Sequence, residues 1–137
     1  PPNVFGFYWE HPEATVKAFT DDGWFRIGDV GDHDEAGYLR ILGRAKELII
    51  TGGYNVYPRE VEDVLCTHPA VTEAAVVGVP STEWGETVVA HVVGTGDTDA
   101  VRAWAESQLA AFKCPRAYHW VESLPRNALG KVQKHRL

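Results

Sequence analysis

The order of apolar segments after residue 47 is the feature that most restricts what this chain can fold into. Short runs rich in Val, Ile and Ala alternate with helical patterns, in the order strands, helix, strand, strand, helix, strand. Such an order is typical of a small α+β domain in which helices pack on a sheet. We therefore predict this fold class for residues 47–137, without internal repeats or low-complexity segments.

Local signals predict where the helices of this domain begin and which faces they bury. Pro58 suits the first turn of a helix, where its missing N–H needs no partner, and Glu60 and Glu62 favour the positive helix end. Thr98 suits the cap of a second helix over residues 99–112. The apolar faces at helical spacing are Val61, Val64 and Leu65 in the first helix and Val101, Trp104, Ala105, Leu109 and Phe112 in the second.

Residues 1–42 have a different pattern. Residues 1–24 are rich in Phe, Tyr and Trp but offer little to bury these rings against, which indicates part of a core whose other parts are missing. Residues 25–30 and 37–42 alternate like the strands of a hairpin, with an acidic turn that ends at Gly37. We therefore expect a β-hairpin ahead of the α+β domain.

Composition excludes several classes of function. The formal net charge, 13 basic minus 19 acidic residues or −6, argues against general affinity for nucleic acids. The six histidines never fall at metal-clamping helical spacings, and the calcium-loop pattern suggested by Asp32 and Asp34 fails at Ala36, so no metal site is predicted.

The cysteines and the apolar segments bear on where the protein is located. Cys66 and Cys114 lie far apart, and no signal peptide or long apolar run is present. These features favour a reducing, cytoplasmic location without a membrane span.

The C-terminal stretch "LPRNALGKVQKHRL" places Lys131 directly after a glycine in a region of basic residues. A phosphate-binding loop of the G-x-x-x-x-G-K-[ST] type is excluded, because Pro125 stands where its first glycine should be and Val132 where its hydroxyl residue should be. The basic end of an otherwise acidic chain suits a small anionic ligand. Alternatively, Lys131 is simply a solvated lysine near the chain end.

Several motifs give the chain a family resemblance. The segment "DGWFRIGDVGDHDEAGYLRILGRAKELIITGGYNVYPREVE", the triplet "WGE" and the ending "LPRNALGKVQK" resemble, in this order, the C-terminal part of acyl-CoA synthetases of the adenylate-forming (AMP-binding) superfamily, most like malonyl-CoA synthetases. The resemblance implies that residues 1–42 end the large N-terminal domain, residues 43–46 form a hinge, and residues 47–137 form a mobile C-terminal lid domain.

The resemblance also implies roles for individual residues. Such enzymes convert ATP and a carboxylic acid, here malonate or a fatty acid, into an acyl-adenylate and then transfer the acyl group to coenzyme A, with Mg²⁺ bound mainly through ATP and the missing N-terminal domain. Lys131 matches the lysine that assists adenylation. The other implied assignments are ribose or phosphate binding by Asp29 and Arg44, a hinge at Lys46, and a coenzyme A channel lined by Gly52, Gly53 and Tyr54.

Non-functional interpretations of these residues, and other functions of the protein, remain open at this point. Asp29 could be an ordinary hairpin-turn acid and Lys46 a surface residue, and Ile27 departs from the family's usual Thr, which disfavours a hydroxyl contact to the nucleotide there. Glu86 of "WGE" is expected to be structural. The chain could also belong to an adenylating enzyme that loads a carrier protein, or be a binding module that keeps the lid fold without chemistry.

Overall fold

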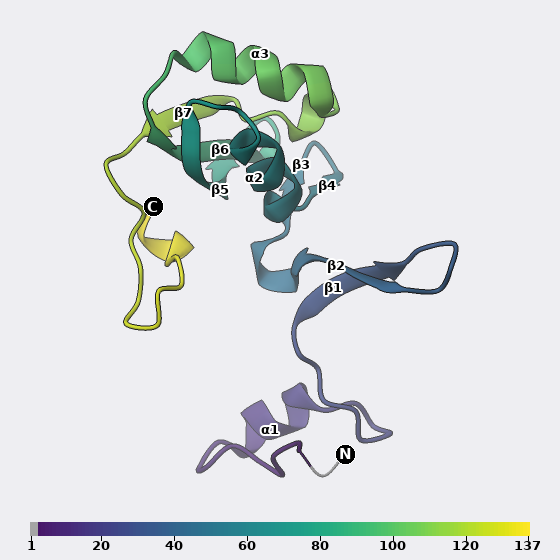
Figure 1. Ribbon diagram of the computed structural model, residues 1–137. Helices are drawn as coiled ribbons and strands as arrows, with labels where there is room; N and C mark the ends of the chain where they lie inside the picture. The colour runs from purple at the N-terminus through teal and green to yellow at the C-terminus, as the bar shows by residue number, and fades with distance from the viewer. Residues whose placement is uncertain (1–2) are drawn as a thin grey trace.

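The computed structural model describes residues 3–137. The described chain begins with a short helix that lies apart from the main body of the molecule in Figure 1 and continues into a β-hairpin that contacts helix α2 (Pro58–Cys66). The bounds of these elements are Pro12–Ala18 for helix α1, Asp29–His33 for strand β1 and Leu39–Arg44 for strand β2.

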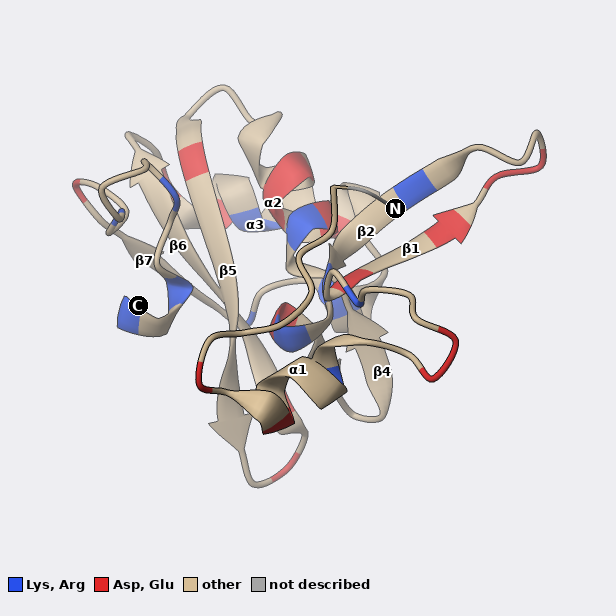
Figure 2. Cartoon of the chain, turned by 90° about the horizontal axis from the view of Figure 1, so that it is seen from below, with Lys and Arg blue, Asp and Glu red and all other residues tan. Residues whose placement is uncertain are grey.

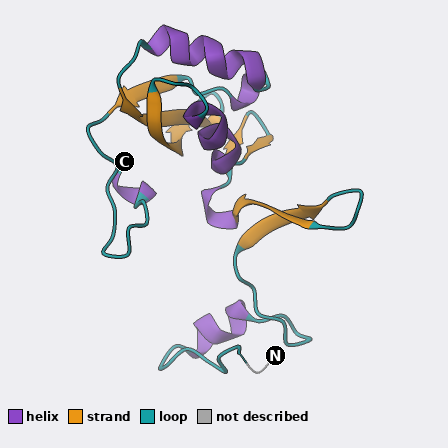
Figure 3. Ribbon diagram, in the orientation of Figure 1, coloured by secondary structure: helices purple, strands orange, loops and turns teal. Residues whose placement is uncertain are grey.

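The α+β domain follows directly, and its secondary structure is mapped in Figure 3. Its strands are β3 (Ile49–Thr51), β4 (Tyr54–Val56), β5 (Val71–Ser81), β6 (Gly85–Gly94) and β7 (Ala117–Trp120). Its helices are α2 (Pro58–Cys66), α3 (Thr98–Gln108) and the short 3₁₀ helices η1 (Ala45–Glu47), η2 (Ala111–Lys113) and η3 (Lys134–Arg136). The predicted fold class is confirmed.

Strand β6 is the centre of the sheet. It pairs antiparallel with β5 along one edge, from Ser81 opposite Gly85 to Val71 opposite Gly94. Its other edge is shared, because β3 joins antiparallel at one end and β7 joins in parallel register further along. Strand β4 closes the far side of β3 as a tight hairpin.

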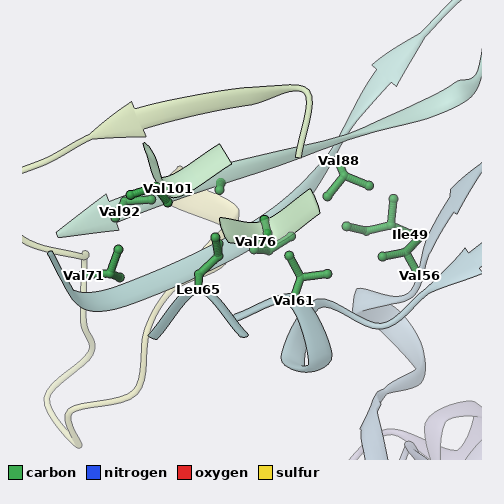
Figure 4. Packing of buried hydrophobic residues seen from close by; sticks show 11 residues of the cluster. Ile49, Val56, Val61, Leu65, Val71, Val76, Val88, Val92 and Val101 are labelled. Atoms are coloured by element: carbon green, nitrogen blue, oxygen red, sulfur yellow. The ribbon is translucent and has the colours of Figure 1, made fainter. Parts of the chain in front are cut away.

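The core lies between this sheet and helices α2 and α3, as the close view in Figure 4 shows. Fully burying one such aliphatic side chain contributes about 1.5–3 kcal/mol relative to leaving it exposed. The largest fully buried side chains are Ile49, Val56, Val61, Leu65, Val76, Val88, Val92 and Val101. The helical faces predicted from spacing thus supply Val61, Leu65 and Val101 to the core.

The hairpin strands lie later in the sequence than predicted. Phe25 forms only a single bridge with Phe19, and the chain turns at Gly28, whose φ of +78° interrupts extended structure. Strand β1 therefore starts at Asp29 instead of residue 25. Because Gly28 ends the first extended stretch, Asp29 opens the hairpin, and the register of the hairpin shifts just after it, between Val30 and Gly31.

The second helix of the domain also differs from the prediction at both ends. Its N-cap is Asp97, whose carboxylate accepts from the Ala100 N–H over 3.2 Å, and Thr98 is already helical. The helix ends at Gln108 because Leu109 adopts an extended conformation. This break lets Leu109 and Phe112 both pack against the core, which one continuous helix over residues 99–112 was expected to achieve.

Aromatic rings near the N-terminus form a small cluster with little cover. Phe5 lies 4.8–5.8 Å, centroid to centroid, from the rings of Tyr8, Phe19 and Phe25. Trp9 and Trp24 are 76% and 67% exposed. These rings have little cover within the described residues, and the expectation that this segment is part of a larger core stays a prediction.

Candidate functional site

Asp29 and Arg44 face each other at the open end of the β1–β2 hairpin. Arg44 Nη1 lies 2.8 Å from Asp29 Oδ1 and also donates to the Ile27 carbonyl oxygen over 3.0 Å. Both side chains line a pocket of about 650 Å³, which we name the hairpin pocket, together with Arg59 and Arg126. Carboxylate acceptors beside guanidinium donors suit a ligand that carries both hydroxyl groups and a phosphate.

Lys131 ends a tight loop over residues 127–131 that is held by its own hydrogen bonds. The Asn127 side-chain oxygen accepts from the N–H groups of Leu129 and Lys131 over 3.0 and 2.9 Å, and the Asn127 N–H donates to the Lys131 carbonyl over 2.9 Å. Gly130 has φ +79°, a conformation that favours glycine and lets the chain turn sharply before Lys131. The loop therefore presents Lys131 from a defined backbone.

The Lys131 side chain is exposed, and within residues 3–137 its ammonium makes no ion pair. The neighbouring cations of the same C-terminal segment differ, since Arg126 pairs with Glu73 and Lys134 pairs with Glu47 and Glu62. An exposed cation without a counterion is available to an anionic ligand.

Lys46 lies in η1, directly after the hairpin, and lines a second pocket of about 670 Å³ together with Lys131. We name it the loop pocket. The fold thus brings together two predicted site residues that lie far apart in the sequence. Asp29 and Arg44 line the neighbouring hairpin pocket, and Lys134 lies between the two pockets and lines both.

Lys134 is a residue of this region that the sequence analysis missed. Its Nζ lies 2.6 Å from Glu62 Oε1 and 2.8 Å from Glu47 Oε2, and its side chain is only 18% exposed. The sequence pattern shows Lys134 only as part of a basic chain end and Glu62 only as an acid near a helix start. The sequence contains one indication that Glu62 is partly buried and needs a cationic partner: it directly follows Val61 of the buried helix face and is therefore close to the core.

The turn between β3 and β4 lies outside both pockets. Gly52 and Gly53 have φ +55° and +83°, and a Cβ on Gly52 would lie 3.0 Å from the Trp84 ring. A Cβ on Gly53 would meet nothing within 4 Å, so its surface is open. Tyr54 stacks on Phe112 with ring centroids 4.6 Å apart. The role of this turn in binding coenzyme A stays a prediction.

Four further titratable groups have pKa values shifted by their local surroundings, and one of them, Cys66, lines the hairpin pocket. Burial raises the pKa of the thiols of Cys66 and Cys114, both of which are free, and so disfavours reactive thiolates. Burial also raises the pKa of Tyr118 to about 12, and its hydroxyl has no hydrogen-bond partner among the described residues. Burial and then the nearby His119 ring lower the pKa of His91.

Two further observations bear on ligands and membranes. Nowhere in residues 3–137 do three His, Cys, Asp or Glu side chains gather as a metal site would require. Over the same part of the chain, no helix has the length and apolar character needed to cross a membrane.

A comparison with known families decides the classification. The sequence profile described as AMP-binding enzyme C-terminal domain matches residues 60–131, more than half of the chain. The chain belongs to the AMP-binding enzyme C-terminal domain family. The matched residues run from α2 to Lys131 and so include the Lys131 loop.

Curated relatives of this AMP-binding C-terminal domain are ligases. A sulfoacetate–CoA ligase of Cupriavidus necator is 45% identical over 98% of this chain and 27% of its own length. A long-chain-fatty-acid–CoA ligase of Bacillus subtilis is 46% identical over 99% of this chain and 25% of its own length. The chain therefore spans about a quarter of the length of these relatives.

Two crystal structures of one protein, MatB from Rhodopseudomonas palustris, match this AMP-binding C-terminal domain chain differently. Both are 50% identical and cover 98% of this chain and 28% of MatB. The ATP-bound structure gives a TM-score of 0.91 and the apo structure one of 0.71. The present structure therefore has the arrangement found in ATP-bound MatB, and the corresponding part of MatB also adopts a second arrangement.

Proposed function

We propose that this chain is the C-terminal part of an ATP-dependent acyl-CoA synthetase and works only with the rest of that enzyme. In the first half-reaction a carboxylate oxygen of the acid attacks the α-phosphorus of ATP, and the bond to pyrophosphate breaks. In the second, the thiol sulfur of coenzyme A attacks the acyl carbon, and AMP leaves. The observation that carries the proposal is the exposed, unpaired Lys131 ammonium on a rigid loop beside the predicted hinge residue Lys46.

In this proposal Lys131 stabilises the first half-reaction. Attack on the α-phosphate brings two anions together and builds negative charge on the phosphoryl oxygens. A cation already placed beside these oxygens lowers the barrier, because the surroundings need little reorganisation during the reaction. The Asn127 hydrogen bonds and the Gly130 turn support this role, since they hold the backbone that carries the ammonium.

Asp29 and Arg44 are proposed to bind the nucleotide. A carboxylate can accept hydrogen bonds from both ribose hydroxyls, and Arg44 has five N–H donors, of which the contacts to Asp29 and Ile27 use only some. The Ile27 side chain is apolar and 60% exposed, so only the backbone of this residue contributes, through its carbonyl contact with Arg44.

Lys46 is proposed as the hinge between the two half-reactions, and residues 1–42, 43–46 and 47–137 as the end of the large domain, the hinge and the lid. The two MatB structures support this division. Both are 50% identical to this chain, yet the ATP-bound structure gives a TM-score of 0.91 and the apo structure one of 0.71. After the swing, Gly52, Gly53 and Tyr54 would line the channel for coenzyme A. The open surface at Gly53 is compatible with close approach of a ligand chain.

Malonate or a fatty acid is the proposed acid. The motifs resemble those of malonyl-CoA synthetases, whereas the sulfoacetate and long-chain-fatty-acid ligases are about equally similar to this chain. Near-equal identity among proteins named for such different acids indicates that this part of the chain does not select the acid.

Magnesium is proposed to enter with ATP and to be held mainly by the N-terminal domain. The residues described here offer no group of three metal-ligating side chains, so no reaction step is assigned to the metal through this chain. The two free cysteines are compatible with the proposed cytoplasmic location.

Two other functions are separable by simple measurements. An adenylating enzyme that loads a carrier protein would transfer the acyl group to that carrier in preference to free coenzyme A. A binding module without chemistry would bind a nucleotide but give no exchange with any acid.

The experiment that tests the proposal is ATP–pyrophosphate exchange by the full-length protein with a panel of acids that includes malonate and fatty acids. We expect exchange with at least one acid and its loss in Lys131→Ala. Absence of exchange with every acid would refute the synthetase function and favour the binding module.

A further inference from the structure

The loop that carries Lys131 is attached to the rest of the domain by two cations, one at each end. Arg126 lies before the loop, where it donates to the Gly130 carbonyl oxygen over 2.6 Å and pairs with Glu73 of β5 over 2.7 Å. Lys134 lies after the loop and pairs with Glu47 and Glu62. Since the loop is bonded internally, its position depends mainly on these two attachments.

The two attachments differ in burial. The side chains of Arg126 and Glu73 are 43% and 44% exposed, so solvent screens their attraction. Those of Lys134 and Glu62 are 18% and 14% exposed. Breaking a largely buried pair leaves a charge without compensation, which is far more costly than breaking an exposed pair. The Lys134 attachment therefore constrains the loop more strongly.

The partners of Lys134 tie the loop to two separate elements. Glu62 belongs to α2, and its Oε1 also accepts from the Val76 N–H of β5 over 2.8 Å, so this carboxylate is fixed to the sheet. Glu47 belongs to η1 and directly follows Lys46. Figure 2 shows basic residues at the C-terminal end of the chain and acidic residues on α2. Lys134 thus connects the C-terminal segment to α2 and to η1, the short helix after the hairpin, which we call the linker.

We propose that Lys134 is a positioning residue for adenylation, which acts by fixing the Lys131 loop relative to the linker through Glu62 and Glu47. The inference rests on the proposed function and deepens it. Between the two lysines, Val132 bridges to Arg126 and the Gln133 N–H donates to the Pro125 carbonyl over 2.7 Å, so a shift at Lys134 is transmitted to Lys131 through a paired backbone. Lys134 itself touches no reacting atom in this scheme.

The test compares half-reactions in the full-length protein. Lys134→Gln should lower kcat for ATP–pyrophosphate exchange by about 10- to 100-fold, because a misplacement of about 1 Å is costly in catalysis. The KM for ATP and thioester formation from supplied acyl-adenylate should stay close to the wild-type values. Lys134→Arg should recover most of the exchange, because it restores a cation between the carboxylates. The matched control is Arg136→Gln, in the same short helix, where the side chain bonds only Gln133.

A second comparison separates positioning from stability. Lys134→Gln should add almost no further loss in a Lys131→Ala background, because its effect passes through Lys131. Equal losses in both half-reactions would mean a merely structural role and overturn the inference, as would exchange in Lys134→Gln at the wild-type rate. A wild-type protein that fails to exchange with any acid would instead overturn the proposed function, and the inference with it.

Discussion

Asp29 and Arg44 are cross-strand partners in the first pair of the β1–β2 hairpin, and their side chains form an ion pair of 2.8 Å. The pair holds the carboxylate at the edge of the hairpin pocket, where Asp29 is only 22% exposed. The register of two short strands, which shifts between Val30 and Gly31, therefore places the proposed ribose-binding group.

Asp29→Asn should weaken nucleotide binding in the full-length protein. The amide keeps the shape but loses the charge-assisted hydrogen bonds, each of which is worth about 1.5–3 kcal/mol. We expect the KM for ATP to rise by roughly 10-fold or more with a smaller change in kcat, measured by pyrophosphate exchange. Asp32→Asn, on the same strand but paired with the exposed Arg40, is the control. An unchanged KM in Asp29→Asn would remove the ribose role.

Lys131→Ala should separate the two half-reactions. Losing one preorganised electrostatic donor costs about 100- to 1000-fold in rate. Pyrophosphate exchange should fall by this factor, whereas most thioester formation from supplied acyl-adenylate should remain, because that step does not need charge stabilisation at the α-phosphate. Similar losses in both steps would argue against the assignment.

Lys46→Pro should have the reverse effect. Proline fixes φ near −65°, which matches the 3₁₀ conformation that Lys46 has in this arrangement but prevents rotation there. Adenylation should be largely kept and thioester formation should fall strongly, as measured by single-turnover assays. Lys46→Ala, which leaves φ free, should affect the thioester step much less. Unchanged rates in both steps for the proline variant would place the hinge elsewhere.

Glu86→Ala should weaken the attachment of strand β3 to strand β6. The Glu86 carboxylate accepts from the Ile50 N–H over 2.7 Å, next to the only register pair of these strands, Thr51 with Gly85. We expect about 1–2 kcal/mol of lost stability in urea denaturation, together with faster hydrogen exchange at the Ile50 amide. Glu83→Ala, which removes an exposed acid from the turn just before β6, should change neither. Protection of Ile50 equal to that in wild type would contradict the structural role.

Acidification should destabilise this chain through His91. Burial and the His119 ring, whose centroid is 5.2 Å away, lower the pKa of His91 in the folded state. The unfolded chain then binds more protons below its ordinary pKa of about 6.5, so stability falls as the pH decreases through that value toward the folded-state pKa. Urea midpoints at pH 7.5 and 5.5 should differ less in His91→Gln than in wild type. His135→Gln, at an exposed position, should keep the wild-type pH dependence.

The amino-acid sequence by itself determined the fold class and the start of α2 at Pro58. These features depend on local properties, namely the hydrophobic period and the fixed φ of proline. Errors arose where one local signal competed with another. Gly28 interrupted the extended stretch that the apolar alternation predicted, and Asp97 capped the helix in place of Thr98.

Tertiary structure alone decided which charges are paired. Lys131 and Lys134 are two lysines separated by two residues in one basic segment, yet the first is exposed and the second is nearly buried between Glu47 and Glu62. Their difference depends on partners that are far away along the chain and come close only when α2 and the linker pack beside the C-terminal segment. Coulomb attraction depends on distance in space and on exclusion of water, and neither quantity is encoded in the local pattern that made Lys131 recognisable.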